Sequence, residues 1–207
     1  QIINLKKFIK SFFKSEEESE PQDSIHGKYM PTKKDPIEER FTFNFIQNGG
    51  KFLYCVDKSE CEKFLSQIIK ENNLSEIEIL CYDDSLLNFF LERNKLVISK
   101  TNLNSKFFLT GCEFLVALDG SLLICAKQIK SHKVNDLPQN FIVFAKTSQL
   151  TETLSEGLKG IKSKYPNNLP TNITTIKNFN NNELENNNFL TYGSAAKNLY
   201  LLLIEDL

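Results

Sequence analysis

The 207-residue chain contains no Trp, two His and five Cys, and none of its cysteines is spaced as C-x-x-C. An odd set of dispersed cysteines predicts neither a disulfide framework nor a structural zinc site or iron–sulfur cluster. His26 and His132 each lack a second His or Cys at ligand spacing, so no metal centre is predicted. We therefore expect reduced thiols and a cytoplasmic location.

An excess of one charge and long apolar runs are also absent. Lys and Arg number 25 against 26 Asp and Glu, which gives a formal net charge of -1 and no global field to attract nucleic acid. No run of roughly eighteen apolar residues occurs, so no integral membrane span is expected. The chain also has no G-x-G-x-x-G after a strand and no P-loop, so no cofactor is predicted.

The composition divides the chain into two parts. Residues 1–36 combine a basic, amphipathic segment, QIINLKKFIKSFFK, with a charged arm that is poor in large apolar residues. The segment fits a packed terminal helix or a helix on a membrane surface, and we expect the arm to be flexible or held by its HGKYMP stretch. Residues 37–207 hold the apolar runs and predict one α/β domain.

Within this domain, apolar runs alternate with stretches of helical periodicity. Strands are predicted at 51–56, 77–82, 96–99, 107–110, 140–145, 171–176 and 199–205. Helices are predicted after a capping box at Ser59–Glu62, after Asp83-Asp84-Ser85, and from Gln149 to about Lys164. This order favours a mainly parallel sheet with helices on both faces.

Two apolar runs, CEFLVAL and SLLICA, meet at Asp119-Gly120. An Asp-Gly pair between apolar strands is a strong hairpin signal, because a type I′ turn needs a positive φ at both central residues. We therefore predict an antiparallel β-hairpin. Two interpretations of the break stay open: a plain turn, and a loop that binds a ligand.

Several features around this hairpin follow one another in a familiar order. First come Thr110, Glu113 and Phe114, then LVA and Leu118-Asp119-Gly120-Ser121. A proline, an apolar strand and a capped helix follow in 138–161. The last stretch is AKNLYLLLIEDL. In this order the stretches resemble the LUD domain, the family of lactate-utilisation protein C. The resemblance covers 107–207 and, more loosely, 41–99. The family's Gly-Pro-Ser-x-Thr-Ala-Asp-Ile-Glu motif has no counterpart here.

The resemblance implies a NagB/RpiA/CoA-transferase-like α/β fold and a setting in lactate or related organic-acid metabolism. One hypothesis is a non-redox accessory or binding component that takes a small organic anion and works with an iron–sulfur oxidoreductase subunit. The other is a transferase or isomerase of the same fold that acts on a sugar phosphate or acyl-CoA. The resemblance does not decide whether the protein is an enzyme, and the oligomeric state stays open.

Glu113 is the predicted catalytic residue, as a base or nucleophile, although a lone carboxylate at a strand end is more often surface charge. We expect the ligand near the strand ends and backbone N–H groups of the two loops. The candidate ligand-binding residues are Thr110, Gly111, Asp119, Gly120, Ser121, Gly193, Ser194 and Lys197. A cleft shared by the hairpin and the terminal loop would bring Glu113 and Lys197 together.

A basic cluster follows the hairpin: Lys127, Lys130, His132 and Lys133. It fits the rim of a site for an acidic substrate, but a solvated loop is the more usual interpretation because charge runs are normally exposed. Cys112 and Cys125 are predicted to be inert core thiols because no His accompanies them.

Overall fold

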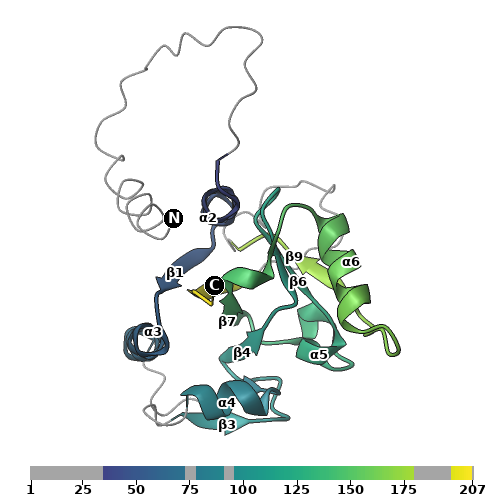
Figure 1. Cartoon of the computed structure of the whole chain (residues 1–207). Coiled ribbons are helices and arrows are strands. Elements are labelled where there is room, and N and C mark those ends of the chain that lie inside the picture. The colour runs from purple at the N-terminus through teal and green to yellow at the C-terminus, as the bar shows by residue number, and fades with distance from the viewer. Residues whose placement is uncertain (1–34, 73–77, 91–95, 180–196, 207) are drawn as a thin grey trace, which may run out of the picture.

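The computed structural model describes residues 35–72, 78–90, 96–179 and 197–206. The N-terminal segment and most of the charged arm lie outside these residues, as do Gly193 and Ser194. Over the described residues the chain forms a mixed α/β structure with two sheets (Figure 1).

Six strands form a fully parallel central sheet in the order β1-β10-β7-β4-β2-β3. They are β1 (Lys51–Cys55), β2 (Glu78–Cys81), β3 (Val97–Ser99), β4 (Phe107–Gly111), β7 (Asn140–Lys146) and β10 (Asn198–Ile204). The middle strands are near-continuous apolar runs, as a sheet covered on both faces requires. The predicted strands are confirmed to within a few residues at each end.

A second sheet has the order β8-β5-β6-β9. Its strands are β5 (Phe114–Val116), β6 (Ser121–Ile124), β8 (Leu150–Thr151) and β9 (Thr174–Ile176). The predicted hairpin is confirmed, since β5 and β6 pair antiparallel with Val116 opposite Ser121. The hairpin therefore belongs to a separate small sheet that packs on the central one.

Helices cover both faces of the central sheet (Figure 1). Side chains of α3 (Lys58–Glu71) and α4 (Asp84–Phe90) share one buried cluster with one face of the sheet. The other face packs against α2 (Ile37–Gln47) and the inner side of the hairpin. The outer side of the small sheet contacts α6 (Leu154–Lys164), and the short helix α5 (Ala126–Ile129) follows β6.

The turn type and two helix starts were predicted wrongly. Gly120 has a positive φ of 68°, but Asp119 does not. The turn is therefore not type I′. Instead, 117–120 form a four-residue loop in which the Gly120 N–H donates to the Val116 carbonyl at 2.9 Å. Helix α3 is capped by Asp57 and not by Ser59, because the Asp57 carboxylate accepts from the Glu60 N–H at 2.8 Å.

The helix expected from Gln149 begins later. Residues Thr147–Gln149 form a 3₁₀ turn, η3, and the short strand β8 follows it. Helix α6 then starts after Thr153, whose hydroxyl accepts from the Glu156 N–H at 3.3 Å. The sequence pattern missed β8 because a two-residue strand has no periodicity to detect.

The strand order of the central sheet reverses between β2 and β4, which makes this a topological switch point. From β2 it moves outward to β3, returns to β4 on the other side of β2, and then continues to β7 and β10. In open α/β sheets, ligands collect outside the carboxyl ends of the strands at such a switch point. The ends of β2 and β4 are therefore the first places to look for a site.

Candidate functional site

The carboxyl end of β4 leads directly into the first predicted site residues. Thr110 is buried, and its hydroxyl donates to the Gly111 carbonyl at 3.2 Å. Two residues later, the Glu113 N–H donates to the Leu123 carbonyl at 2.8 Å, so Glu113 is fixed at the base of the hairpin. The structure thus brings Thr110, Gly111 and Glu113 together at one end of the sheet.

The Glu113 side chain is 1% exposed and its carboxylate is almost fully partnered. Lys164 Nζ donates to Oε2 at 2.8 Å, Gln128 Nε2 donates to Oε1 at 3.0 Å, and the Tyr165 hydroxyl lies 3.1 Å from Oε1. The Cys125 thiol adds a weaker contact at 3.4 Å. We call these five residues, Glu113, Cys125, Gln128, Lys164 and Tyr165, the Glu113 cluster.

These contacts keep Glu113 ionised. Burial by itself would raise the pKa of the Glu113 carboxyl, but the hydrogen bonds from Lys164 and Gln128 outweigh it and hold that pKa below its usual value. Burial would lower the pKa of the Lys164 amine, but its bond to Glu113 leaves that pKa above its usual value. The pair is therefore carboxylate and ammonium at neutral pH, with the carboxylate shielded from a substrate in this conformation.

The exposed side of the cluster is cationic. The Lys164 side chain is 52% exposed although its amine is tied to Glu113. Its Nζ lies 5.3 Å from the centre of the Tyr165 ring, and Lys127 Nζ, from α5, lies 5.4 Å from the same ring. Two amines and a phenol thus converge on one point of the surface from α5 and the end of α6, an arrangement that suits a small anion.

Two glycines allow α6 to bring Lys164 and Tyr165 to Glu113. A Cβ at Gly160 would lie 2.3 Å from Cζ of Phe114, and a Cβ at Gly157 would lie 3.2 Å from Cδ2 of Leu123. The helix therefore packs unusually close to the outer side of the hairpin. The signal that sequence reasoning missed is this pair of glycines, spaced three residues apart so that both face one side of the helix.

The Asp119-Gly120-Ser121 break is a docked turn. Asp119 Oδ1 accepts from the Ser121 N–H and hydroxyl at 3.2 and 2.7 Å, while the Asp119 carbonyl accepts from Asn48 Nδ2 at 2.7 Å. Asn44 of α2 donates to the Ala117 carbonyl at 2.8 Å. The Asp119 and Ser121 side chains thus bond within the turn, while backbone carbonyls dock it on α2 and its C-cap. A ligand role for these residues stays a prediction.

Lys197 lies at the other end of the sheet from Glu113. It directly precedes β10, whose first residue pairs with Asn140, and Asn140 is also level with Phe107 at the start of β4. Glu113 follows the opposite end of β4, roughly 13 Å farther along at about 3.3 Å per residue. The predicted pairing of Glu113 with Lys197 in one cleft is therefore wrong. Gly193 and Ser194 lie outside the described residues.

Lys197 is 2% exposed, and its amine bonds to the backbone. Its Nζ donates to the carbonyls of Leu137 and Pro138 at 2.8 and 3.2 Å and lies 5.5 Å from the centre of the Phe141 ring. Burial lowers the pKa of this amine to about 8, while the charge of Asp136 acts in the opposite direction. Lys197 thus joins the start of β10 to the loop before β7.

This pKa predicts a stability that rises with pH. Between about pH 8 and the unfolded lysine pKa near 10.4, the unfolded chain binds more protons than the folded one. Lys197 should therefore make the free energy of unfolding increase across this window, by about 1 kcal/mol per pH unit at most. Urea unfolding from pH 7 to 10.5 should show this slope, and Lys197→Met should remove it. The exposed Lys159→Met is the control, and an equal slope in both variants would contradict the assignment.

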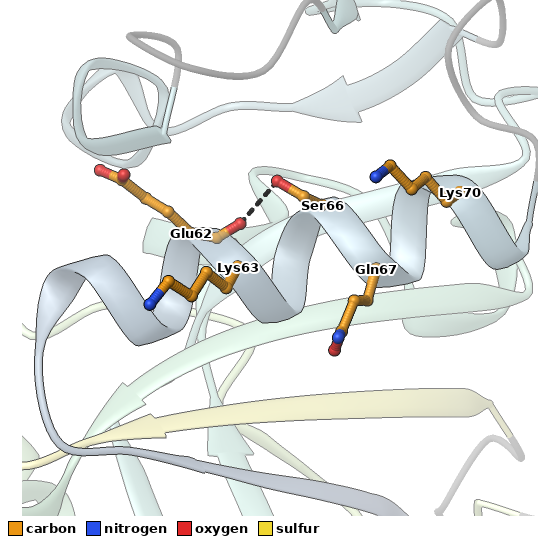
Figure 2. A pocket seen from close by; sticks show the side chains of 5 residues that line it. All are labelled: Glu62, Lys63, Ser66, Gln67 and Lys70. Carbon is orange, nitrogen blue, oxygen red and sulfur yellow. Dashed lines mark hydrogen bonds between the residues drawn. The ribbon is translucent and has the colours of Figure 1, made fainter.

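A shallow hollow of about 330 Å³ lies on the outer side of α3, and Figure 2 shows the side chains that line it. All five come from this one helix: Glu62, Lys63, Ser66, Gln67 and Lys70. The Ser66 hydroxyl donates to the Glu62 carbonyl at 2.7 Å, a bond within the helix itself. The hollow contains none of the predicted site residues and gathers no groups from different elements.

Within the described ranges, no group of three or more His, Cys, Asp and Glu side chains could hold a metal ion. In the same part of the chain, no helix combines the length and the apolar character that crossing a bilayer would need.

Comparisons with known proteins give the family and the fold. The model of the LUD domain matches residues 38–204, which is most of the chain. A DUF162 family protein from Deinococcus radiodurans has a crystal structure that is similar with a TM-score of 0.57 and 12% identity, covering 82% of this chain and 96% of that one. No curated protein matches significantly. The family match confirms the resemblance expected from the sequence: this chain belongs to the LUD domain family.

Proposed function

We propose that this LUD-domain protein is a non-redox component of lactate or related organic-acid utilisation that binds a small organic anion. The family membership supports the metabolic setting, since LUD stands for lactate utilisation. The observation that carries the binding role is the half-exposed Lys164 side chain, whose amine lies 2.8 Å from the buried Glu113 carboxylate and close to the Tyr165 ring, which Lys127 also contacts.

The physical argument is preorganisation. A free surface lysine loses side-chain entropy when it binds a ligand, but Lys164 is already held by Glu113 and by the packing of α6. Lys127 adds a second positive charge, so the surface stays cationic although Glu113 neutralises Lys164. A carboxylate ligand would thus meet one ordered amine, the amine of the exposed Lys127 side chain and a phenol.

In this proposal Glu113 is a positioning residue for Lys164 and Tyr165. A nucleophilic role, as in CoA transfer, would require the buried carboxylate to leave four donors. The binding role needs no such rearrangement and is the one we favour. An iron–sulfur oxidoreductase subunit as partner belongs to the same proposal, because the resemblance to lactate-utilisation protein C implies that setting.

The test is a thermal-shift screen with lactate, other organic acids, sugar phosphates, CoA and folates. A ligand at a hundred times its Kd should stabilise the protein by about 2.7 kcal/mol. Lys127→Gln should reduce the shift given by an organic acid without disturbing the bonds of Glu113, whereas Lys159→Gln on the exposed side of α6 should not. Stabilisation by a sugar phosphate or CoA alone would favour the transferase or isomerase hypothesis.

A further inference from the structure

A second group of polar side chains meets at the topological switch point, and the proposed function does not use it. Tyr82 directly follows the last residue of β2, and the register of Cys81 with Leu109 places it level with Thr110. The Tyr82 ring packs edge-to-face on Phe108, with the ring centres 5.5 Å apart. Tyr82 therefore stands at the carboxyl ends of β2 and β4, where ligands of open α/β sheets collect.

The Tyr82 hydroxyl is buried and has no hydrogen-bond partner within the described part of the chain. Burial raises the pKa of this phenol, so it carries its proton at neutral pH and is a donor. Buried polar groups almost always have a partner, because leaving one unsatisfied is costly. The hydroxyl thus needs an acceptor that the described protein groups do not provide.

Two basic side chains from the loop after α5 cover Tyr82. The His132 ring stacks on the Tyr82 ring with the centres 6.0 Å apart and an angle of 15° between the planes. Lys130 Nζ lies 6.0 Å from the centre of the Tyr82 ring, and the Lys130 side chain is exposed. The part of the basic cluster that sequence reasoning weighed as a solvated loop thus contacts a partly buried aromatic residue.

The Lys130 backbone is strained. Its φ of 56° and ψ of -132° fall in a region that glycine occupies far more readily than lysine. The backbone is held there from both sides, since the Lys130 N–H donates to the Ala126 carbonyl at 2.9 Å and its carbonyl accepts from Asn172 Nδ2 at 3.4 Å. Strain of this kind persists only where the surrounding structure holds it, and it is concentrated at functional sites.

We propose that Tyr82, Thr110, Lys130 and His132 form a binding site for the oxyanion group, a phosphate or a carboxylate, of a small molecule. One ligand oxygen accepts from the Tyr82 hydroxyl once the exposed Lys130 side chain swings off the ring, and the Lys130 ammonium balances the ligand charge. The site is distinct from the Glu113 cluster, because Lys127 reaches Tyr165 whereas Lys130 reaches Tyr82.

Calorimetric titration with inorganic phosphate and, separately, with acetate tests the site and distinguishes the two oxyanions. At least one probe should bind saturably to the full chain. Tyr82→Phe and Lys130→Gln should each weaken that binding about tenfold or more, because each removes a charge-assisted contact. Lys159→Gln, at an exposed position of α6 that belongs to neither proposed site, should leave it unchanged. The proposal is overturned if neither probe binds, or if the Tyr82 and Lys130 variants bind as well as the wild type.

Stability gives a second readout that does not depend on a ligand. Lys130→Gly should raise the Tm, because glycine relieves the strained backbone, and should weaken probe binding at the same time. Tyr82→Phe should leave the Tm unchanged or raise it, since the hydroxyl it removes is unpartnered. A clear loss of Tm in Tyr82→Phe would show that the hydroxyl has a structural partner and would overturn the site.

Discussion

Gly120→Val is expected to lower the free energy of unfolding by about 2 kcal/mol or more, from two effects that act together. The φ of 68° at Gly120 is unfavourable for a β-branched residue. In addition, a Cβ at this position would lie 2.4 Å from the backbone carbon of Asn44 and the nitrogen of Phe45. Because those atoms belong to helix α2, the clash cannot be relieved by rotating a side chain. Urea unfolding monitored by circular dichroism measures the loss.

Gly111→Ala is the matched control for the Gly120 variant. Among the described glycines, Gly111 is not one with a positive φ, and its Cβ would lie 3.6 Å from the Phe144 carbonyl oxygen, which is ordinary contact. Its unfolding free energy should change by less than about 1 kcal/mol. If Gly120→Val were as mild as this control, the docking of the turn on α2 would be wrong.

Glu113→Gln should cost about 1–3 kcal/mol of unfolding free energy, even though the side chain keeps its size. In the wild type, Lys164, Gln128 and Tyr165 all donate to the two carboxylate oxygens of Glu113. In Glu113→Gln one of these oxygens is replaced by an NH₂ group, so at least one of the three donors loses its acceptor. The half-exposed Lys164 can turn to water, which limits the loss. Chemical denaturation at pH 7 measures the difference. Glu152→Gln, which breaks the more exposed pair with Arg40, is the control and should cost less than about 1 kcal/mol.

The pH dependence of the Glu113 effect provides an independent check. The folded pKa of Glu113 lies below its unfolded value, near 4.3. The stability it contributes is therefore fully present above that unfolded pKa and is lost as the pH falls through the folded pKa. The difference between wild type and Glu113→Gln should be constant from pH 6 to 8 and shrink in acid. A difference that grew in acid would mean that Glu113 is protonated in the folded protein.

The central sheet could be predicted from the sequence because its strands have a strong local signal. The apolar runs that became β7 and β10 are bounded by polar residues, and a sheet covered on both faces needs such runs. The hairpin could be predicted for the same reason, from Asp119-Gly120 between two apolar stretches. The turn type could not, because the contact of Gly120 with the α2 backbone is between residues far apart in sequence.

The candidate site was predicted in part. Glu113 was identified from the order of residues around it, but its partners Lys164 and Tyr165 follow it by about fifty positions and meet it through the packing of α6. Lys197 was expected at the same edge because it is charged and precedes a strand, yet in a parallel sheet the residue before a strand lies at the opposite edge from the residue after one. The predicted parallel sheet already implied opposite edges for Lys197 and Glu113, and this consequence was not applied.

The most direct test of the proposed function is a crystal structure of the full chain with the organic acid that gives the largest thermal shift. The account predicts that a carboxylate group of the acid lies within hydrogen-bond distance of Lys164 Nζ, near the Tyr165 ring, while the Glu113 carboxylate keeps its bond to Lys164. An acid bound away from Lys164, Tyr165 and Lys127, or no bound acid at a saturating concentration, would contradict it.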